Sequence, residues 1–331
     1  MLIFKTDTTD PRYNLAIEDF FVRSSKYQEP ILFLWQNHNT IVIGRNQNVT
    51  SEVNIKLALA DDVTIIRRNT GGGAVFHDLG NLNFSIIYDD KQNTGISMFQ
   101  ETMTPILDAL KLYNLNPCFL GRNDIAINGK KISGNAMLKH QNRFLQHGTL
   151  LFNSNLELLS KYLTVDRQKI ISKNIKSISS RVTNINNEAE KPIEIADFIK
   201  KLINVFSQKQ NVKEITLTDE DKLEINKLFV EKYCSHDWTF NKHNDFNYKN
   251  KIYYPGKGLF EVELNIESGA IKEIKLFGDF LGFIGTNEIE QKLTNVKYDH
   301  QSILDVLKTI DIQKIFGADI TNEELLNLLI M

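Results

Sequence analysis

Residues 67–85 read RRNTGGGAVFHDLGNLNFS, a segment that combines two arginines, three successive glycines and a polar run. Glycine has no Cβ and reaches backbone conformations in which neighbouring N–H groups point at one anion. Arg67 and Arg68 add guanidinium groups, which pair with phosphate or carboxylate oxygens through several hydrogen bonds. Three glycines alone are typical of a tight surface turn. With the arginines and the polar run, the segment predicts the active site of an enzyme that handles a phosphate or an acyl phosphate, with Arg67 and Asn81 as supports.

The two best-known phosphate-binding motifs are absent from this segment. The pattern G-x-x-x-x-G-K-[ST] of a P-loop does not occur. The pattern G-x-G-x-x-G of a dinucleotide fold fails because Phe76 occupies the position of its third glycine. The sequence therefore excludes both of these nucleotide-binding loops.

A second candidate site surrounds the dipeptide Asn128-Gly129, which lies between two short apolar runs. Asn-Gly is the strongest short hairpin signal, because both turn residues need a positive φ. A two-residue loop also sets the register of the two strands. The pairs that this register predicts are Ala126 with Lys131, Asp124 with Ser133, Ile125 with Ile132 and Ile127 with Lys130.

One face of this hairpin is predicted to bind a ligand. Asp124, Lys131 and Ser133 share that face, and Gly134 beside them leaves room for a ligand. The isoleucines share the opposite face, which is predicted to enter the core. Lys131, rather than Lys130, should therefore point into a site for a metal–phosphate group; the alternative is a half-exposed hairpin with a surface ion pair.

Hydrophobic spacing predicts the elements that position these segments. The expected strands are 31–35 and 40–44, which pair around the turn 36–39, followed by 63–67, 74–76 and 82–88. The expected helices include 14–25, Ser51 to Ala60, 98–113, 193–208 and 218–233. Residues 236–251 are polar and predict a linker. Three strands and two helices follow it, which predicts a small α+β domain. The predicted domains are residues 1–247 and 248–331.

Composition narrows the class of protein. The chain has 331 residues, a net charge of −2 and two cysteines, Cys118 and Cys234, which form no metal-ligand cluster. The charge offers no general basic surface for nucleic acid. Few thiols, no signal peptide and no apolar run of membrane-spanning length predict a cytoplasmic protein without a membrane segment. Cys118 is expected to be a buried thiol in a strand.

Taken together, the motifs resemble those of the lipoate–protein ligase family. The matching segments are Arg67-Arg68, TGGGAVFHDLGN from Thr70, GRND from Gly121, GKKISGNA from Gly129, HGTLLFN from His147, SISSRVTN from Ser177, NLAIED from Asn14, LFLWQN from Leu32 and IVIGRNQN from Ile41. The resemblance implies a mixed-sheet α/β catalytic domain of the kind shared with biotin ligases and class II aminoacyl-tRNA synthetases. A small α+β accessory domain would follow it.

The resemblance also implies a reaction in two steps. Lipoate and ATP would give lipoyl-AMP and pyrophosphate, and the lipoyl group would pass to a lysine of a lipoyl domain. That carrier would belong to a 2-oxoacid dehydrogenase acyltransferase subunit or be a glycine-cleavage H protein. By their places in the motifs, the residues that would bind ATP and the adenylate are Arg68, Gly73, Ala74, Val75, Phe76 and Lys131. The residues that would bind lipoate are Glu18, Trp35, Gly72, His77 and Lys131. Mg²⁺ would be held by Asn123 and Asp124.

Lys131 is the catalytic residue that this resemblance implies, since it would bridge the lipoate carboxyl group and the α-phosphate. His147 would orient the hairpin neighbourhood, and Arg181 would brace the adenylate loop. Two other functions stay open. A transferase of the same fold would use a cysteine nucleophile without ATP, and a non-catalytic protein would only bind lipoyl domains.

Overall fold

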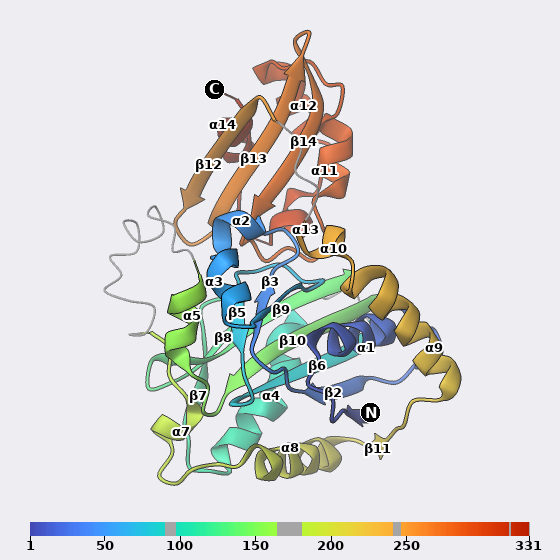
Figure 1. Ribbon diagram of the computed structural model, residues 1–331, viewed down its shortest axis with the longest axis vertical. Helices are drawn as coiled ribbons and strands as arrows, with labels where there is room; N and C mark the ends of the chain where they lie inside the picture. Colours follow the sequence, from blue (N-terminus) through green and yellow to red (C-terminus); the bar gives the residue numbers. More distant parts are fainter. Residues whose placement is uncertain (90–96, 164–180, 241–245, 318, 331) are drawn as a thin grey trace.

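The computed structural model describes residues 1–89, 97–163, 181–240, 246–317 and 319–330. Figure 1 shows a larger unit built on a mixed sheet and, above it in orange and red, a smaller C-terminal unit of three strands and several helices. The fold is therefore mixed α/β with a C-terminal α+β domain, as the sequence predicts.

Eight strands form the large sheet, in the order β11-β1-β2-β6-β10-β9-β8-β7. β1 runs parallel to β2 and β11, and every other neighbouring pair is antiparallel. The strands are β1 (Leu2–Lys5), β2 (Ile31–Trp35), β6 (Asn81–Asp89), β7 (Pro117–Leu120), β8 (Asp124–Ile127), β9 (Lys130–His140), β10 (Arg143–Leu151) and β11 (Lys213–Glu214).

Helices cover both faces of this sheet, which is why β2 is apolar throughout. Ile31, Phe33 and Trp35 face α1 (Pro11–Arg23), α9 (Asp219–Leu228) and the π-helix Phe229–Tyr233, whereas Leu32 and Leu34 face α4 (Ser97–Lys111) and α8 (Ile195–Lys209). α1 begins where Asp10 accepts a hydrogen bond from the Arg12 N–H and Pro11 opens the first turn. The candidate site lies on the α1 face.

A second, three-stranded sheet carries the arginine–glycine segment. Its order is β4-β3-β5, with β4 (Thr64–Arg67), β3 (Thr40–Ile43) and β5 (Val75–His77). The short helices α2 (Val49–Glu52), α3 (Ile55–Ala60) and α5 (Leu156–Tyr162) pack against it. Asn48 and Asn54 cap α2 and α3, so the single helix predicted from Ser51 is wrong.

The predicted pairing of strands 31–35 and 40–44 is also wrong. β2 lies between β1 and β6, so both of its hydrogen-bonding edges are taken, and β3 pairs in the other sheet. The connection is held by Asn14 of α1, whose side chain donates to the Gln36 carbonyl and to Asn37 Oδ1. The segment therefore links two sheets instead of closing a hairpin.

The Asn-Gly turn forms as predicted, with φ of 52° at Asn128 and 75° at Gly129. Ala126 pairs with Lys131 and Ile127 with Lys130, but Ile125 pairs with Ser133 and Asp124 with Gly134. The predicted pairs of Ile125 with Ile132 and of Asp124 with Ser133 are therefore wrong. A β-bulge at Ile132 inserts one residue and moves Ser133 to the core face, where it is fully buried.

The C-terminal unit is an antiparallel meander with helices on one side, and it has its own apolar core. Its elements are β12 (Tyr248–Tyr254), β13 (Gly258–Glu267), β14 (Ala270–Gly278), α11 (Asn287–Leu293), α12 (His300–Leu307), α13 (Ile312–Phe316) and α14 (Asn322–Leu329). The residues predicted as a linker begin with a helix, α10 (His236–Phe240), which packs on the larger unit. A further short helix of the larger unit is α7 (Ile185–Glu188).

Backbone hydrogen bonds join the two units at a segment that follows β14. The Gly278 N–H donates to Asn46 O at 2.8 Å, and the Gly72 and Lys139 N–H groups donate to Phe280 O and Phe283 O at 3.0 Å each. The segment 278–283 therefore lies across the glycines and β9, and it places C-terminal side chains at the site.

Candidate active site

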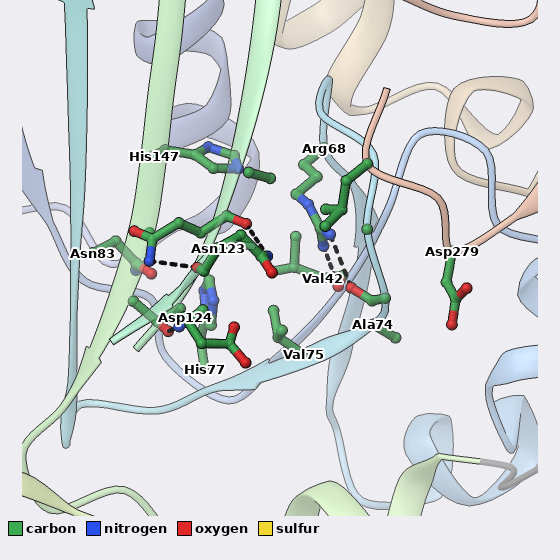
Figure 2. A pocket seen from close by; sticks show the side chains of 18 of the residues that line it. Val42, Arg68, Ala74, Val75, His77, Asn83, Asn123, Asp124, His147 and Asp279 are labelled. Carbon is green, nitrogen blue, oxygen red and sulfur yellow. Dashed lines mark hydrogen bonds between the residues drawn. The ribbon is translucent and has the colours of Figure 1, made fainter. Parts of the chain in front are cut away.

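A cavity of about 240 Å³ lies where β9, the glycine segment and the C-terminal unit meet (Figure 2). Its lining brings together most of the residues that the sequence singles out. They are Trp35, Arg68, Gly72, Gly73, Ala74, Val75, His77, Asn123, Asp124 and Lys131, joined by Leu15, Val42, Asn83, Gly134, Asn135, Ala136, His147, Gly148, Thr149, Asp279 and Leu281. Glu18 and Phe76 are not among them.

Five residues in one row, each from a different strand, form the floor of this cavity. Trp35 of β2 pairs with Asn83 of β6, which pairs with Thr149 of β10. Thr149 Oγ1 accepts from the Gly134 N–H of β9 at 3.3 Å, and Gly134 pairs with Asp124 of β8. The row runs from an aromatic side chain at one end to a carboxylate at the other.

Lys131 and Asp124 form an ion pair at the charged end, with Nζ 2.8 Å from Oδ1. Both side chains line the cavity and Lys130 does not, so the predicted orientation of Lys131, as opposed to Lys130, is confirmed. A Cβ on Gly134 would lie 2.9 Å from Lys131 Nζ, so this glycine leaves the room that the ammonium needs. The predicted partner Ser133 is absent from the lining because of the bulge.

The backbone of Lys131 is held by residues 181–183. The Lys131 N–H donates to Arg181 O at 2.7 Å, and the Thr183 N–H donates to Lys131 O at 2.9 Å. Arg181 thus braces the lysine strand through its carbonyl group. Ser177–Ser180, the first half of the motif to which it belongs, lie outside the described residues.

Asn123 and Asp124 both line the cavity and offer oxygen ligands for a divalent cation. Asn135 holds this turn, since its N–H donates to Asn123 O at 3.0 Å and its Nδ2 donates to the same oxygen at 2.8 Å. No group of three or more His, Cys, Asp or Glu side chains that could hold a metal occurs among the described residues. One carboxylate and one amide oxygen suit Mg²⁺, which keeps several waters or phosphate oxygens as ligands.

Arg67 is fully buried and serves as a clamp for three segments. Its guanidinium donates to the carbonyl oxygens of Gly44, Arg45, Gln47, Trp238 and Thr239, at 2.7–3.1 Å. Burial lowers its pKa to about 10, so the group stays charged at neutral pH. Arg67 does not line the cavity; it joins β4 to the loop after β3 and to α10.

Arg68 lines the cavity, but most of its N–H groups donate hydrogen bonds to the glycine loop. Nη2 donates to Gly71 O and Gly73 O at 2.7 and 2.8 Å, and Nη1 donates to Val42 O at 3.1 Å. Burial lowers its pKa to about 10, and the carboxylate of Glu18 opposes that shift. The guanidinium therefore shapes the loop that faces the cavity and adds a positive charge to it.

The glycines are needed for close approach to the C-terminal unit. A Cβ on Gly71 would lie 2.5 Å from Phe280 O, and Gly72 has a φ of 92°. Gly73, Ala74 and Val75 face the cavity after them. The Phe76 side chain points the other way and stacks on Tyr162 with ring centroids 5.7 Å apart, so its side chain is part of the core of the small sheet.

Glu18 lies behind the cavity wall in a chain of buried hydrogen bonds. Its Oε1 accepts from Ser85 Oγ at 2.6 Å and bonds His147 Nδ1 at 2.8 Å. His147 Nε2 bonds Thr70 Oγ1 at 2.8 Å, and Thr70 accepts from Arg68 Nε. His147 thus positions the glycine segment against α1, and not the neighbourhood of the hairpin, where the sequence predicts its role.

His77 is a neutral imidazole whose tautomer is set by its neighbours. Asn14 Nδ2 donates to two backbone carbonyls and to Asn37 Oδ1, so Asn37 presents Nδ2 to His77 Nδ1, at 3.2 Å. Burial, followed by the charge of Arg68, lowers the His77 pKa to about 3. Nδ1 accepts, and the proton therefore resides on Nε2, which has no partner among the described residues.

Sequence reasoning missed Asn83, Asp279 and Leu281. Asn83 had a signal, because Asn81, Asn83 and Ser85 alternate with apolar residues along one strand and so share a polar face. Asp279 and Leu281 had none, since only the docking of the C-terminal unit brings them to the cavity. Cys118 is exposed on β7, so the prediction that it is buried is wrong; it pairs across from Ala126 and does not line the cavity.

Two family models match the chain. Residues 10–207 match the lipoyl protein ligase A/B catalytic domain, and residues 243–329 match the bacterial lipoate protein ligase C-terminus. Lipoate–protein ligase 1 of Staphylococcus aureus is 37% identical over 327 residues, which are 99% of both chains. A probable lipoate–protein ligase A of Mycoplasma pneumoniae is 37% identical over 321 residues, 96% of this chain and 94% of its own length.

Solved structures of similar fold include ligand complexes. LipL1 of P. falciparum in complex with lipoate has a TM-score of 0.78 at 26% identity, covering 99% of this chain and 97% of its own. A bipartite ligase from Thermoplasma acidophilum, studied with its E2 lipoyl domain, has a TM-score of 0.66 at 29% identity, covering 75% of this chain and 98% of its own. A lipoate–protein ligase A bound with ATP has a TM-score of 0.63 at 28% identity, covering 72% of this chain and 98% of its own. Among the described residues, no helix is long and apolar enough to cross a bilayer.

Replacing Arg67 with lysine should destabilise the fold. Lysine offers three donors where the guanidinium serves five carbonyl oxygens, so several buried acceptors lose a partner. We expect the free energy of unfolding to fall by about 3 kcal/mol, measured by urea denaturation. Lys5→Ala, which removes an exposed ion pair with Glu214, is the control and should change it by about 0.5 kcal/mol or less. Equal effects would contradict the clamp.

The low pKa of His77 predicts a loss of stability in acid. Between pH 6.5, where an unfolded histidine titrates, and about pH 3, the unfolded chain binds a proton that folded His77 refuses. The stability that comes from keeping His77 neutral is thus present above pH 6.5 and is lost as the pH falls. The free energy of unfolding, measured by denaturation at each pH, should fall more steeply between pH 6 and 4 in the native chain than in His77→Gln. The difference in slope should be about 1.4 kcal/mol per pH unit. Identical slopes would mean that His77 protonates in the folded state.

Proposed function

The chain belongs to the lipoate–protein ligase family, and we propose that it activates lipoate with ATP to lipoyl-AMP and then transfers the lipoyl group to a lysine of a lipoyl domain. The observation that carries this proposal is the pairing of two walls across one cavity. Arg68 and the backbone of Gly73 to Val75 form one wall, and the Lys131–Asp124 pair forms the other.

This pairing suits the attack of a carboxylate on the α-phosphate of ATP. Attack brings two anions together, and charge gathers on phosphate oxygens in the transition state. Lys131 would contact both the lipoate carboxyl oxygen and the α-phosphate, and Arg68 would add positive charge from the glycine side. Groups held in place before reaction stabilise such charge by several kcal/mol, because they need no reorganisation. Lys131 would stay beside the mixed anhydride when the acceptor amine attacks.

We assign the nucleotide to the wall formed by Gly73, Ala74 and Val75, with Phe76 supporting it from the core. The solved ligase of similar fold that is bound with ATP supports the choice of nucleotide. Asn123 and Asp124 would hold Mg²⁺, which when bound neutralises phosphate charge. The Lys131–Asp124 ion pair would hold the ammonium in position for the phosphate oxygens.

We assign the lipoate chain to the part of the cavity that runs towards Trp35, with Gly72 and His77 beside it. Glu18, which lies behind the wall, would act on lipoate through His147 rather than by contact. The P. falciparum complex with lipoate supports lipoate as the ligand. The archaeal ligase studied with its E2 lipoyl domain supports a lipoyl domain as the acceptor, from a 2-oxoacid dehydrogenase subunit or an H protein. We place the boundary of the two domains at residues 247 and 248.

The main alternative is an ATP-independent acyltransferase of the same fold, which needs a cysteine nucleophile. The two cysteines, Cys118 and Cys234, both lie outside the cavity lining, which favours the ligase. A protein that only binds lipoyl domains has no need for the Lys131–Asp124 pair, and here both side chains face the cavity.

Lys131→Ala should abolish pyrophosphate release in the presence of lipoate, ATP and Mg²⁺. The positioned ammonium acts in the transition state, so kcat should fall at least about 100-fold. Lys130→Ala is the matched control, because Lys130 lies at the exposed tip of the same hairpin and pairs with Glu188. Release that survives in Lys131→Ala, or that needs no lipoate in the native protein, would overturn the mechanism.

Cys118→Ser should leave the lipoate- and ATP-dependent rates within about twofold of those of the native chain, because the thiol lies outside the lining. The same pair of proteins is then tested with an acyl-carrier donor and no ATP. Transfer by the native protein that disappears in Cys118→Ser would establish the acyltransferase instead.

A further inference from the structure

We propose that the groove between the two units binds a dianionic phosphate group on Arg45 and Asn46, either free phosphate or the monoester of a small organic molecule. The groove has a volume of about 860 Å³ and is separate from the cavity of the candidate active site, since no residue of the described chain lines both. This site goes beyond the proposed function and does not depend on it. Two polar side chains without partners, and the charge around them, identify it.

The walls of the groove come from both units. The larger unit supplies α1, the end of β9, the π-helix and the loop after β3, and the C-terminal unit supplies β14 and residues 284–290. Apolar side chains also line it, among them Val22, Leu138 and Phe277. A groove of this size with a mixed lining suits a ligand that carries an organic part beside its charged group.

Arg45, in the motif IVIGRNQN that the proposed function leaves unused, presents an unpaired guanidinium to this groove. Its side chain reaches the C-terminal unit, where a Cβ on Gly285 would lie 3.3 Å from Nη1. The guanidinium makes no hydrogen bond, ion pair or ring contact with any described residue. Its nitrogen atoms are not enclosed by protein, so they open on the groove. A guanidinium held in this way offers two parallel N–H groups to the oxygens of a phosphate.

Asn46 adds a second unpaired group next to the first. The residue is only 7% exposed, and its side-chain amide has no hydrogen bond within the described part of the chain. Like the guanidinium, the amide is not enclosed and lines the groove. Its backbone carbonyl accepts from the Gly278 N–H, which fixes the residue where the two units meet. Buried amides are almost always hydrogen-bonded, so this one indicates a ligand acceptor beside Arg45.

The charge around Arg45 favours a dianion. Burial lowers its pKa to about 10, and the charges of Asp19 and Arg23 act on it as well, so the group stays charged at neutral pH and belongs to their cluster. The carboxylate of Asp19 is already shared, since Arg23 Nε lies 2.7 Å from Oδ1 and Lys232 Nζ lies 2.8 Å from Oδ2. Three cations around one carboxylate leave two positive charges. A phosphate monoester, with a charge close to −2 at neutral pH, balances them, whereas a monocarboxylate balances only one.

Apart from Arg67, whose clamp is described above, the other charged side chains of the lining also have partners. Lys275 Nζ lies 3.2 Å from Glu290 Oε2, and Glu288 Oε1 lies 2.9 Å from Lys292 Nζ. The three that remain interact with neighbours too and are Lys139, Asp237 and Glu273. Within the described part of the chain, Arg45 is thus the charge in this groove that an incoming anion finds unpaired.

The test measures the binding of inorganic phosphate and of glycerol 3-phosphate to the full chain, by isothermal titration calorimetry in a phosphate-free buffer. The native protein should bind both with a Kd below about 10 mM. Tighter binding of the ester would assign the site to an organic phosphate, and equal constants would assign it to the phosphate group alone. A native protein that binds neither probe overturns the proposal.

Arg45→Gln should bind the better probe at least about tenfold more weakly, because it removes a charge-assisted pair of hydrogen bonds. Arg122→Gln is the matched control, since it makes the same change in charge at another contact of the two units, where Nη1 donates to Gly317 O at 2.8 Å. Arg122 does not line the groove, so the control should change the Kd by about twofold or less. An Arg45→Gln protein that binds like the native one overturns the proposal.

A second variant, Asn46→Leu, keeps the size of the side chain and the whole charge cluster, so it tests the site even if Arg45→Gln does not fold. Losing the amide should weaken phosphate binding about fivefold. Lys131→Ala, in the other cavity, should leave this binding unchanged. Phosphate binding that is lost in Lys131→Ala and kept in both groove variants would place the phosphate in the candidate active site and overturn the proposal.

Discussion

Two adjacent buried guanidinium groups impose the constraint on which the site depends. A charged group away from water must be fully hydrogen-bonded, or its burial costs several kcal/mol. Arg67 and Arg68 meet this demand with main-chain carbonyl oxygens, Arg67 on the loop after β3 and on α10, and Arg68 on the glycine segment. These hydrogen bonds fix the positions of β4, the loop after β3, α10 and the glycine segment relative to one another.

A buried carboxylate, that of Glu18, completes this arrangement. It faces Arg68 through Thr70 and His147, so a carboxylate of α1 and a guanidinium of the glycine segment compensate each other across two hydrogen-bonded side chains. Ser85 joins the indole N–H of Trp35 to the same carboxylate. The wall at Arg68 and the wall at Trp35 are thus joined by one hydrogen-bond network.

The cavity exists because two sheets and a second unit meet at one place. The large sheet supplies the floor row, the small sheet supplies the arginine–glycine wall, and the segment 278–283 closes the side where Asp279 and Leu281 enter the lining (Figure 2). The glycines at 71 and 72 serve this contact, since a Cβ on Gly71 would lie 2.5 Å from Phe280 O, which also accepts a hydrogen bond from the Gly72 N–H.

The sequence by itself determined the features that depend on a few neighbouring residues. The Asn128-Gly129 turn, a helix predicted over residues 14–25 and found over 11–23, and the orientation of Lys131 follow from local backbone preferences or from the alternation of side chains next to a tight turn. The set of cavity residues was largely recognisable too, because motifs keep together the residue types that one chemistry needs.

Only the tertiary structure decided what depends on partners far away in the chain. The hairpin register beyond Ala126 depends on a bulge at Ile132, and the separation of β2 from β3 depends on β1 and β6 taking both edges of β2. The inward turn of Phe76 and the exposure of Cys118 likewise depend on which elements pack above them. Strand pairing and burial are set by non-local contacts, whose energy no short stretch of sequence contains.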